Sequence, residues 1–146
     1  MHRVVVTGMG GICALGSDWR SIESAFEAGR SAVRHMSDWD RYGDLNTRLA
    51  APIPEFSTPA HWTRKQLRSM GRVSQLAVFA SERALQDARL LGDASIADGR
   101  MGVACGSSTG STAEIKAFGN MLLNGVTDDL SANSYVRMMP HTTTAN

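Results

Sequence analysis

The chain has 146 residues, of which 42% are hydrophobic and 20% are charged, a composition typical of one soluble globular domain or of part of a larger one. Fifteen basic and fourteen acidic residues give a formal net charge of +1 without any block of like charge, so neither a nucleic-acid partner nor an anionic membrane surface is indicated. The first apolar run is too short for a signal peptide or a membrane span, and the two cysteines form no CxxC motif. We therefore expect a cytoplasmic protein with reduced thiols and no membrane span.

The chain opens with a β-branched run at residues 3–7, which has no polar alternation and ends at a glycine-rich turn at residues 8–11. This pattern predicts a strand that is buried on both faces. Ser17 or Asp18 then precedes apolar residues at helical spacing, and Gly29 stands where a helix C-cap is expected. The first unit is therefore predicted to be a strand, a glycine loop and a helix.

Residues 30–63 hold most of the prolines and show no sustained periodicity, which predicts an irregular surface excursion with a short edge strand within residues 47–53. Apolar residues then recur at helical spacing from Arg72 to Leu91 and stop at Gly92. This is the strongest helix signal in the chain. Because the apolar stripe is rich in alanine, we expect another element to pack closely against it.

Residues 101–105 form a second short apolar run, followed by a polar glycine loop at residues 106–110. Ser111 and Glu114 then have the spacing of a capping box, which predicts a helix that ends near Gly125. Residues 126–146 are expected to be loop-like, with an apolar patch that includes Met138 and Met139. The alternation of strands and helices predicts an α/β fold around a mainly parallel sheet.

The glycine turn partly resembles a dinucleotide-binding fingerprint, but Cys13 occupies the position of the third glycine and no helix opens at Gly10. We favour a plain buried turn over an α/β nucleotide-binding module, which stays an alternative. The second loop, at residues 105–112, places hydroxyl groups and backbone amides at a predicted helix N-terminus. These groups either bind an anion or a thioester carbonyl, or satisfy their own loop and cap the helix.

Neither a catalytic cysteine nor a metal site is indicated by these residues. Cys105 has no sequence-near base to form a thiolate, so we interpret it as structural. The histidines have no metal-ligand spacing and no clustered carboxylates beside them; they are His2, His35, His61 and His141. We expect no metal and no cofactor.

The order of several segments resembles the N-terminal half of the β-ketoacyl-ACP synthases. The opening segment at residues 3–10 with Leu15-Gly16 is similar to the first strand and turn of that family. Further landmarks lie along essentially the whole chain: Ala28-Gly29-Arg30-Ser31, the stretch at residues 63–75, Ala84-Leu85-Gln86-Asp87-Ala88, and Gly102-Val103-Ala104-Cys105-Gly106-Ser107-Ser108-Thr109-Gly110. Residues 106–112 and 138–143 are most similar to the synthases of aryl polyene clusters.

The resemblance implies a thiolase-like α/β fold, of which residues 1–146 would be the incomplete N-terminal domain, with a mainly parallel five-stranded sheet covered by helices. It implies decarboxylative Claisen condensation of an acyl thioester with malonyl-ACP in fatty-acid, polyketide or aryl-polyene synthesis. The partners it implies are acyl carrier protein and a second ketosynthase subunit in a homodimer or heterodimer. It implies no metal and no cofactor.

The family's nucleophilic cysteine and two catalytic histidines match no residue of this chain, so no catalytic role passes to Cys13, Cys105 or His141. The cysteine is expected shortly after Asn146, and these 146 residues alone should be inactive. By the same resemblance, Thr109, Ser108 and Met138 are substrate-binding candidates in the acyl pocket. A threonine at 109 replaces a more usual apolar residue, which disfavours a long saturated acyl chain.

A non-catalytic partner of the chain-length-factor type, in which the nucleophile is replaced, is the first alternative. The nucleotide-binding module is the second. If the 146 residues exist alone, we expect them to expose apolar surface and to self-associate.

Overall fold

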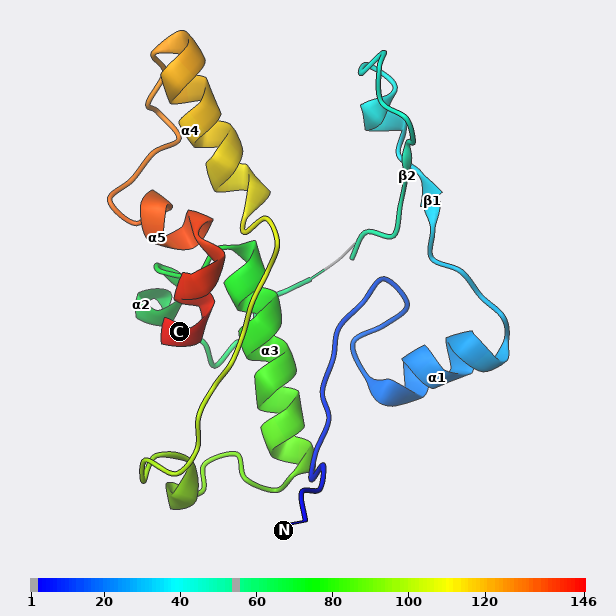
Figure 1. Ribbon diagram of the computed structural model, residues 1–146, viewed down its shortest axis with the longest axis vertical. Coiled ribbons are helices and arrows are strands. Elements are labelled where there is room, and N and C mark those ends of the chain that lie inside the picture. Colours follow the sequence, from blue (N-terminus) through cyan, green and yellow to red (C-terminus); the bar gives the residue numbers. More distant parts are fainter. Residues whose placement is uncertain (1–2, 54–55) are drawn as a thin grey trace.

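The computed structural model describes residues 3–53 and 56–146 (Figure 1). The long helix α3 (Arg72–Asp87) runs through the middle, with α1 (Trp19–Glu27) and the pair β1 (Arg34–His35) and β2 (Leu49–Ala50) on one side of it. On the other side lie α2 (Arg64–Leu67), α4 (Thr112–Asn124) and α5 (Ser134–Met138). Three short 3-10 helices complete the order: η1 (Ser37–Trp39), η2 (Ala94–Ile96) and η3 (Pro140–Ala145).

Helix α1 forms where its capping residues predict it. The Asp18 side chain accepts hydrogen bonds from the Ser21 backbone nitrogen at 3.0 Å and from the Ser21 hydroxyl at 2.7 Å. The helix buries Ile22 and Ala25 and ends before Gly29, whose φ of +61° is the left-handed conformation that favours glycine at a helix end. This part of the prediction is confirmed.

Helix α3 begins at the predicted residue but ends at Asp87, four residues before Leu91. The chain turns at Arg89, which has a φ of +58°, and the Leu90 nitrogen donates to the Leu85 carbonyl at 2.8 Å. This hydrogen bond has the pattern that closes a helix through a left-handed residue. The apolar spacing therefore continues past the helix into a tight turn, and the predicted end at Gly92 is wrong.

Helix α4 is confirmed, and Gly125, with a φ of +68°, terminates it by donating from its nitrogen to the Met121 carbonyl at 3.0 Å. The loop-like prediction for residues 126–146 is wrong, because the segment contains α5 and η3. Both are too short to be stable alone. Packing of α5 against α4 and of η3 against α3 supports them, and residue spacing along the chain does not encode such contacts.

The predicted strands at residues 3–7 and 101–105 do not form in the described part of the chain, and their side chains are not buried. Val4 is 94% exposed and Val103 is 68% exposed. A strand exists only with a hydrogen-bonded neighbour, and the sheet found among the described residues is the antiparallel pair β1–β2. The other strands of the expected five-stranded sheet are not formed within residues 3–53 and 56–146. Strand β2 does lie inside the predicted edge strand at residues 47–53.

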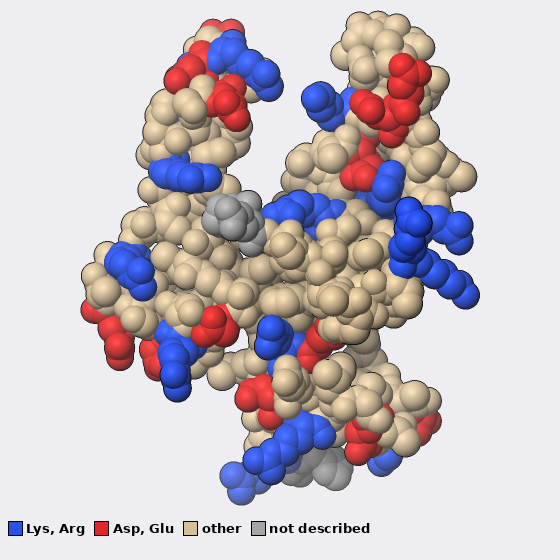
Figure 2. Space-filling view, turned by 180° about the vertical axis from the view of Figure 1, so that it is seen from behind, with Lys and Arg blue, Asp and Glu red and all other residues tan. Residues whose placement is uncertain are grey.

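A small apolar core lies beside α3, where Trp62, Met70 and Phe79 are buried and Phe56 packs edge-on to Phe79 with ring centroids 5.5 Å apart. The indole nitrogen of Trp62 donates to Glu82 at 2.9 Å, so the buried ring keeps a hydrogen-bond partner. On the surface, basic and acidic side chains are interspersed (Figure 2), in agreement with the near-zero net charge.

Candidate functional site

The glycine turn lies directly on the C-terminal half of α3. An added Cβ at Gly8 would lie 2.5 Å from the Ala88 nitrogen, and one at Gly10 would lie 2.5 Å from the Ala84 nitrogen. The Met9 nitrogen, between them, donates to the Asp87 carboxylate at 2.9 Å. Residues 8–10, which we call the strap, therefore pack directly against the backbone of α3 along its alanine stripe. This confirms the expected close packing.

This packing explains the glycines without a phosphate. In a dinucleotide fingerprint the glycines leave backbone open to a pyrophosphate, whereas Gly8 and Gly10 are covered by α3. The helix that follows begins at Trp19, well after Gly10. The nucleotide-binding alternative thus loses the pattern that motivated it.

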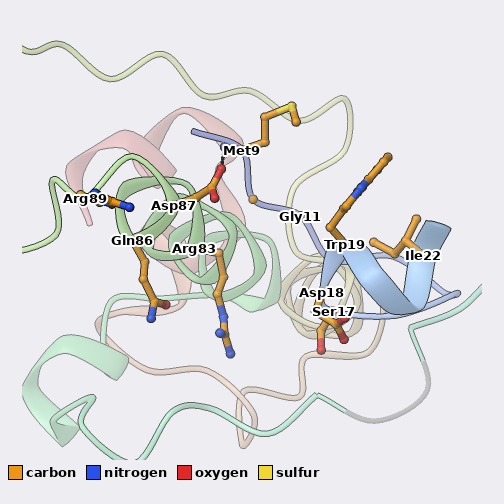
Figure 3. A pocket seen from close by; sticks show the side chains of 11 residues that line it. Met9, Gly11, Ser17, Asp18, Trp19, Ile22, Arg83, Gln86, Asp87 and Arg89 are labelled. Carbon is orange, nitrogen blue, oxygen red and sulfur yellow. Dashed lines mark hydrogen bonds between the residues drawn. The ribbon is translucent and has the colours of Figure 1, made fainter. Parts of the chain in front are cut away.

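A cleft of about 920 Å³ opens beside this strap, between the glycine turn, the start of α1 and the end of α3 (Figure 3). Figure 3 shows Trp19 and Ile22 on the α1 side and Arg83, Gln86 and Asp87 on the α3 side. None of the three predicted acyl-pocket residues lines this cleft. The cleft is therefore distinct from the site that the sequence predicts.

The second loop and Met138, which are far apart in sequence, meet in the structure. The Ser111 nitrogen donates to the Met138 carbonyl at 3.2 Å, and the Gly110 nitrogen donates to the Ser107 hydroxyl at 3.2 Å. Gly110 has a φ of +78°, and a Cβ there would overlap the Met138 carbonyl oxygen. Only glycine allows both this conformation and this approach.

The side chains of the predicted pocket residues differ in exposure. Ser108 and Thr109 are exposed, with their hydroxyl oxygens 3.4 Å apart, while Met138 is half-buried. The structure therefore brings the loop and Met138 together through their backbones and leaves the two hydroxyls at the loop surface. A substrate role for these three residues stays a prediction.

The predicted capping box at Ser111 and Glu114 is wrong, although Ser111 is the N-cap residue of α4. Its hydroxyl makes no capping bond to its own helix and instead accepts from the Val73 nitrogen of α3 at 3.4 Å. Glu114 forms an ion pair with Arg137 of α5, with 3.1 Å between nitrogen and oxygen. The Ser111 hydroxyl thus accepts a hydrogen bond at the N-terminus of α3, whose own N-cap residue, Gly71, has no side chain.

Sequence reasoning missed Gly71, Ser74 and Thr143 as parts of this region. An added Cβ at Gly71 would overlap the Ser111 hydroxyl and the Arg137 carbonyl oxygen. Ser74 and Thr143 are buried, and their hydroxyl oxygens lie 3.2 Å apart. A glycine placed before a strongly predicted helix, where a polar cap is usual, was the one available signal.

Among the described residues, the cysteines and histidines form no reactive cluster. Cys13 and Cys105 are free thiols, both half-buried. His35 pairs with Asp40 and His61 with Glu82, both at 3.2 Å, His141 is exposed, and His2 lies outside the described residues. Within residues 3–53 and 56–146, no group of three or more potential metal ligands lies together. Nor does any helix in that part of the chain have the length and apolar character to cross a membrane.

Three carboxyl groups have a lowered pKa, those of Asp18, Asp93 and Asp98, and none of them belongs to the second loop. Hydrogen bonds from Ser21 hold the pKa of Asp18 below its ordinary value. The pKa of Asp93 is lowered by hydrogen bonds from Ser95, and that of Asp98 by hydrogen bonds from Arg100. All three stabilise local turns or caps, and none marks a general acid or base.

Comparisons with known proteins agree with the resemblance seen in the sequence. Residues 1–145 match the family model described as "Beta-ketoacyl synthase, N-terminal domain". The chain is 39% identical over 130 residues to nodulation protein E of Rhizobium meliloti (strain 1021), which covers 86% of the chain and 31% of that protein. It is 32% identical over 113 residues to 3-oxoacyl-[acyl-carrier-protein] synthase 2 of Staphylococcus aureus (strain COL), covering 74% of the chain and 26% of that protein.

Solved structures show the same likeness. The chain superposes on a β-ketoacyl synthase from Burkholderia phymatum STM815 with a TM-score of 0.90 and 63% identity, covering 99% of the chain and 36% of that structure. It superposes on the ishigamide ketosynthase/chain length factor with a TM-score of 0.66 and 26% identity, covering 92% of the chain and 33% of that structure. The chain thus spans between about a quarter and a third of the length of the proteins that it matches.

Proposed function

Because this chain belongs to the β-ketoacyl synthase family and has its thiolase-like fold, we propose that the complete protein joins an acyl thioester to malonyl-ACP by decarboxylative Claisen condensation. Residues 1–146 would be its N-terminal domain. The similarity to a 3-oxoacyl-[acyl-carrier-protein] synthase supports this reaction. In this proposal the chain contributes substrate contacts, and the nucleophilic cysteine and its histidines lie outside it.

The observation that carries the proposal is the meeting of the second loop with Met138. The hydrogen bond from the Ser111 nitrogen to the Met138 carbonyl and the covered Gly110 hold the two segments at backbone contact. Thr109 is exposed on this loop, and Met138 is half-buried. In our proposal these two side chains, one polar and one apolar, line an acyl pocket that selects the length or saturation of the acyl chain.

We propose acyl carrier protein as the substrate's carrier, a homodimer or a heterodimer with a related subunit as the assembly, and the cytoplasm as the location. Within the family, the aryl polyene subgroup stays our proposal for the pathway, on the strength of residues 106–112 and 138–143. Fatty-acid and other polyketide synthesis are the competing pathways. Products released from malonyl-ACP and a panel of acyl-ACP primers would distinguish them.

The non-catalytic alternative has an observation of its own. One of the matched structures is the ishigamide ketosynthase/chain length factor, whose name includes a chain length factor. The two roles differ in whether a nucleophilic cysteine is present, and Cys13 and Cys105 are half-buried free thiols that we interpret as structural. Labelling of the complete protein decides between them.

The first test is the intact mass of the complete protein before and after treatment with cerulenin, an epoxide that alkylates the nucleophilic cysteine of such synthases. One label on a cysteine beyond residue 146 supports the condensing enzyme. A longer chain that takes no label supports the non-catalytic partner. A label on Cys13 or Cys105 contradicts our assignment of both as structural.

The second test concerns Thr109. Thr109→Val replaces a hydroxyl by a methyl of similar size, so we expect kcat/KM for a saturated acyl-ACP to rise by about 10-fold, the effect of one methyl group in an apolar pocket. Thr127→Val, a matched change at an exposed position outside the loop, should leave kcat/KM unchanged. Equal effects of the two variants would remove Thr109 from the pocket.

A further inference from the structure

Three segments meet at the start of α3 through small polar residues instead of apolar side chains. They are the first turn of α3, the start of α4, and the stretch from α5 into η3 (Figure 1). Ser74 and Ser111 are each 2% exposed and Thr143 is 5% exposed, which makes them among the most buried side chains described. We call Gly71, Ser74, Ser111 and Thr143 the hydroxyl junction.

The side chains of the junction are held by hydrogen bonds. Ser111 accepts from the Val73 nitrogen, and the Ser74 and Thr143 hydroxyls bond to each other at 3.2 Å. No other side-chain hydrogen bond of Ser74 or Thr143 is found among the described residues. Each hydroxyl would therefore lose its only such partner if the other were removed, and a buried polar group without a partner is destabilising.

The junction is connected to the proposed acyl pocket by short stretches of backbone. Thr143 lies in η3, five residues after Met138, and Met138 accepts from the Ser111 nitrogen at 3.2 Å. Ser111 in turn follows Thr109 and Gly110. A shift of η3 relative to α3 therefore moves the Met138 carbonyl, and with it the loop that carries Thr109.

We propose that Ser74 and Thr143 are positioning residues that set the spacing between Met138 and the Thr109 loop, and so the acyl-chain preference of the site. This rests on the proposed function, because it takes these residues to line the acyl pocket. Neither hydroxyl is proposed to touch the substrate. A directed bond between two buried hydroxyls suits this role because it has a narrow range of favourable length and angle, whereas apolar contacts tolerate sliding.

The experiment uses four variants of the complete protein: Ser74→Ala, Thr143→Val, the double variant, and Thr143→Ser as the control that keeps the hydroxyl. Two readouts are taken on each. One is amide hydrogen exchange at residues 108–111, measured against exchange at 72–76 and 140–145. The other is the ratio of kcat/KM between a short and a long acyl-ACP.

Each single variant leaves one buried hydroxyl unpaired, so we expect exchange at residues 108–111 to rise by about 5- to 150-fold. The acyl-preference ratio should change by about tenfold or more, as expected when a substrate-contacting wall is displaced. The double variant removes both polar groups and should return both readouts most of the way to wild type. Thr143→Ser should behave as wild type.

Two results would overturn the inference. Faster exchange confined to residues 72–76 and 140–145, with 108–111 unchanged, would mean that the junction does not reach the loop. A lowered thermal midpoint with an unchanged acyl-preference ratio would mean that the pair only stabilises the fold. If wild type condenses no acyl thioester, the proposed function fails, and the exchange readout still decides whether the hydroxyl pair positions the loop.

Discussion

Replacing Gly10 by alanine is expected to be strongly destabilising, because the glycine strap touches the α3 backbone itself. The new methyl group would lie 2.5 Å from the Ala84 nitrogen and 2.7 Å from the Arg83 Cβ, and it would overlap the Ala80 carbonyl. Favourable separations are about 3.5–4.0 Å, so the strap must retreat by about 1 Å. Helix backbone cannot rotate away as a side chain does. The expected loss is about 2–3 kcal/mol of unfolding free energy, the upper part of the range for overpacked sites.

Thermal and urea unfolding followed by tryptophan fluorescence measures this loss, since Trp62 is buried in the core beside α3. For a chain of this size the thermal midpoint should fall by about 5–10 °C. Gly11→Ala is the matched control, because a Cβ at Gly11 meets no atom within 4 Å, and it should change stability by less than about 0.5 kcal/mol. Equal losses in the two variants, or a loss below about 0.5 kcal/mol for Gly10→Ala, would refute the packing argument.

Two further predictions concern helix caps. Hydrogen bonds from Ser21 lower the pKa of Asp18, so its capping contribution is complete above the unfolded pKa of about 3.9 and is lost as the pH falls through the lower folded value. Asp18→Asn keeps a capping side chain that does not titrate. Between pH 5 and pH 2, amide exchange in α1 should therefore increase less in this variant than in wild type. The same pH profile in both proteins would contradict this prediction. Thr63 forms a capping box with Gln66 at the start of α2, so Thr63→Ala should lower the free energy of unfolding in urea by about 1 kcal/mol. Thr58→Ala, at an exposed position, should leave it unchanged. Equal losses in the two variants would exclude a stabilising cap at Thr63.

Helices α1, α3 and α4 were predictable because most of their determinants are local. Asp18 and Gly29 bound α1, Gly125 ends α4, and the spacing within α3 sets its apolar stripe. The strands predicted at 3–7 and 101–105 are not formed, because a short apolar run specifies what a strand would bury but not which segment it pairs with. Exposed Val4 and Val103 are the consequence in this chain. Helix α5 was missed because packing against α4, and not its own spacing, supports it.

The candidate site was predictable only in part, and only through resemblance. Residues 108, 109 and 138 were predicted as pocket residues from the order of the family's sequence landmarks. In the structure, the Ser111 nitrogen donates to the Met138 carbonyl and so connects the two segments. Apart from Gly71 before α3, the hydroxyl junction had no usable pattern, since a serine in a helix and a threonine in a polar run are ordinary at any surface. The surrounding segments approach closely at Gly71 and Gly110, where an added Cβ would overlap the backbone of α5. Close approach of this kind is a tertiary property.

Both glycine-dependent contacts involve the same helix, and this gives α3 a role beyond packing. The strap at Gly8 and Gly10 lies on its C-terminal half, and the hydroxyl junction is at its N-terminal end. A helix of 16 residues is about 24 Å long and bends little over that length. The loops that follow residues 3–7 and 101–105 are therefore fixed to one rigid element. A substitution at Gly10 should consequently lower global stability while leaving the spacing of Met138 and Thr109 intact, whereas one at Ser74 should change that spacing first.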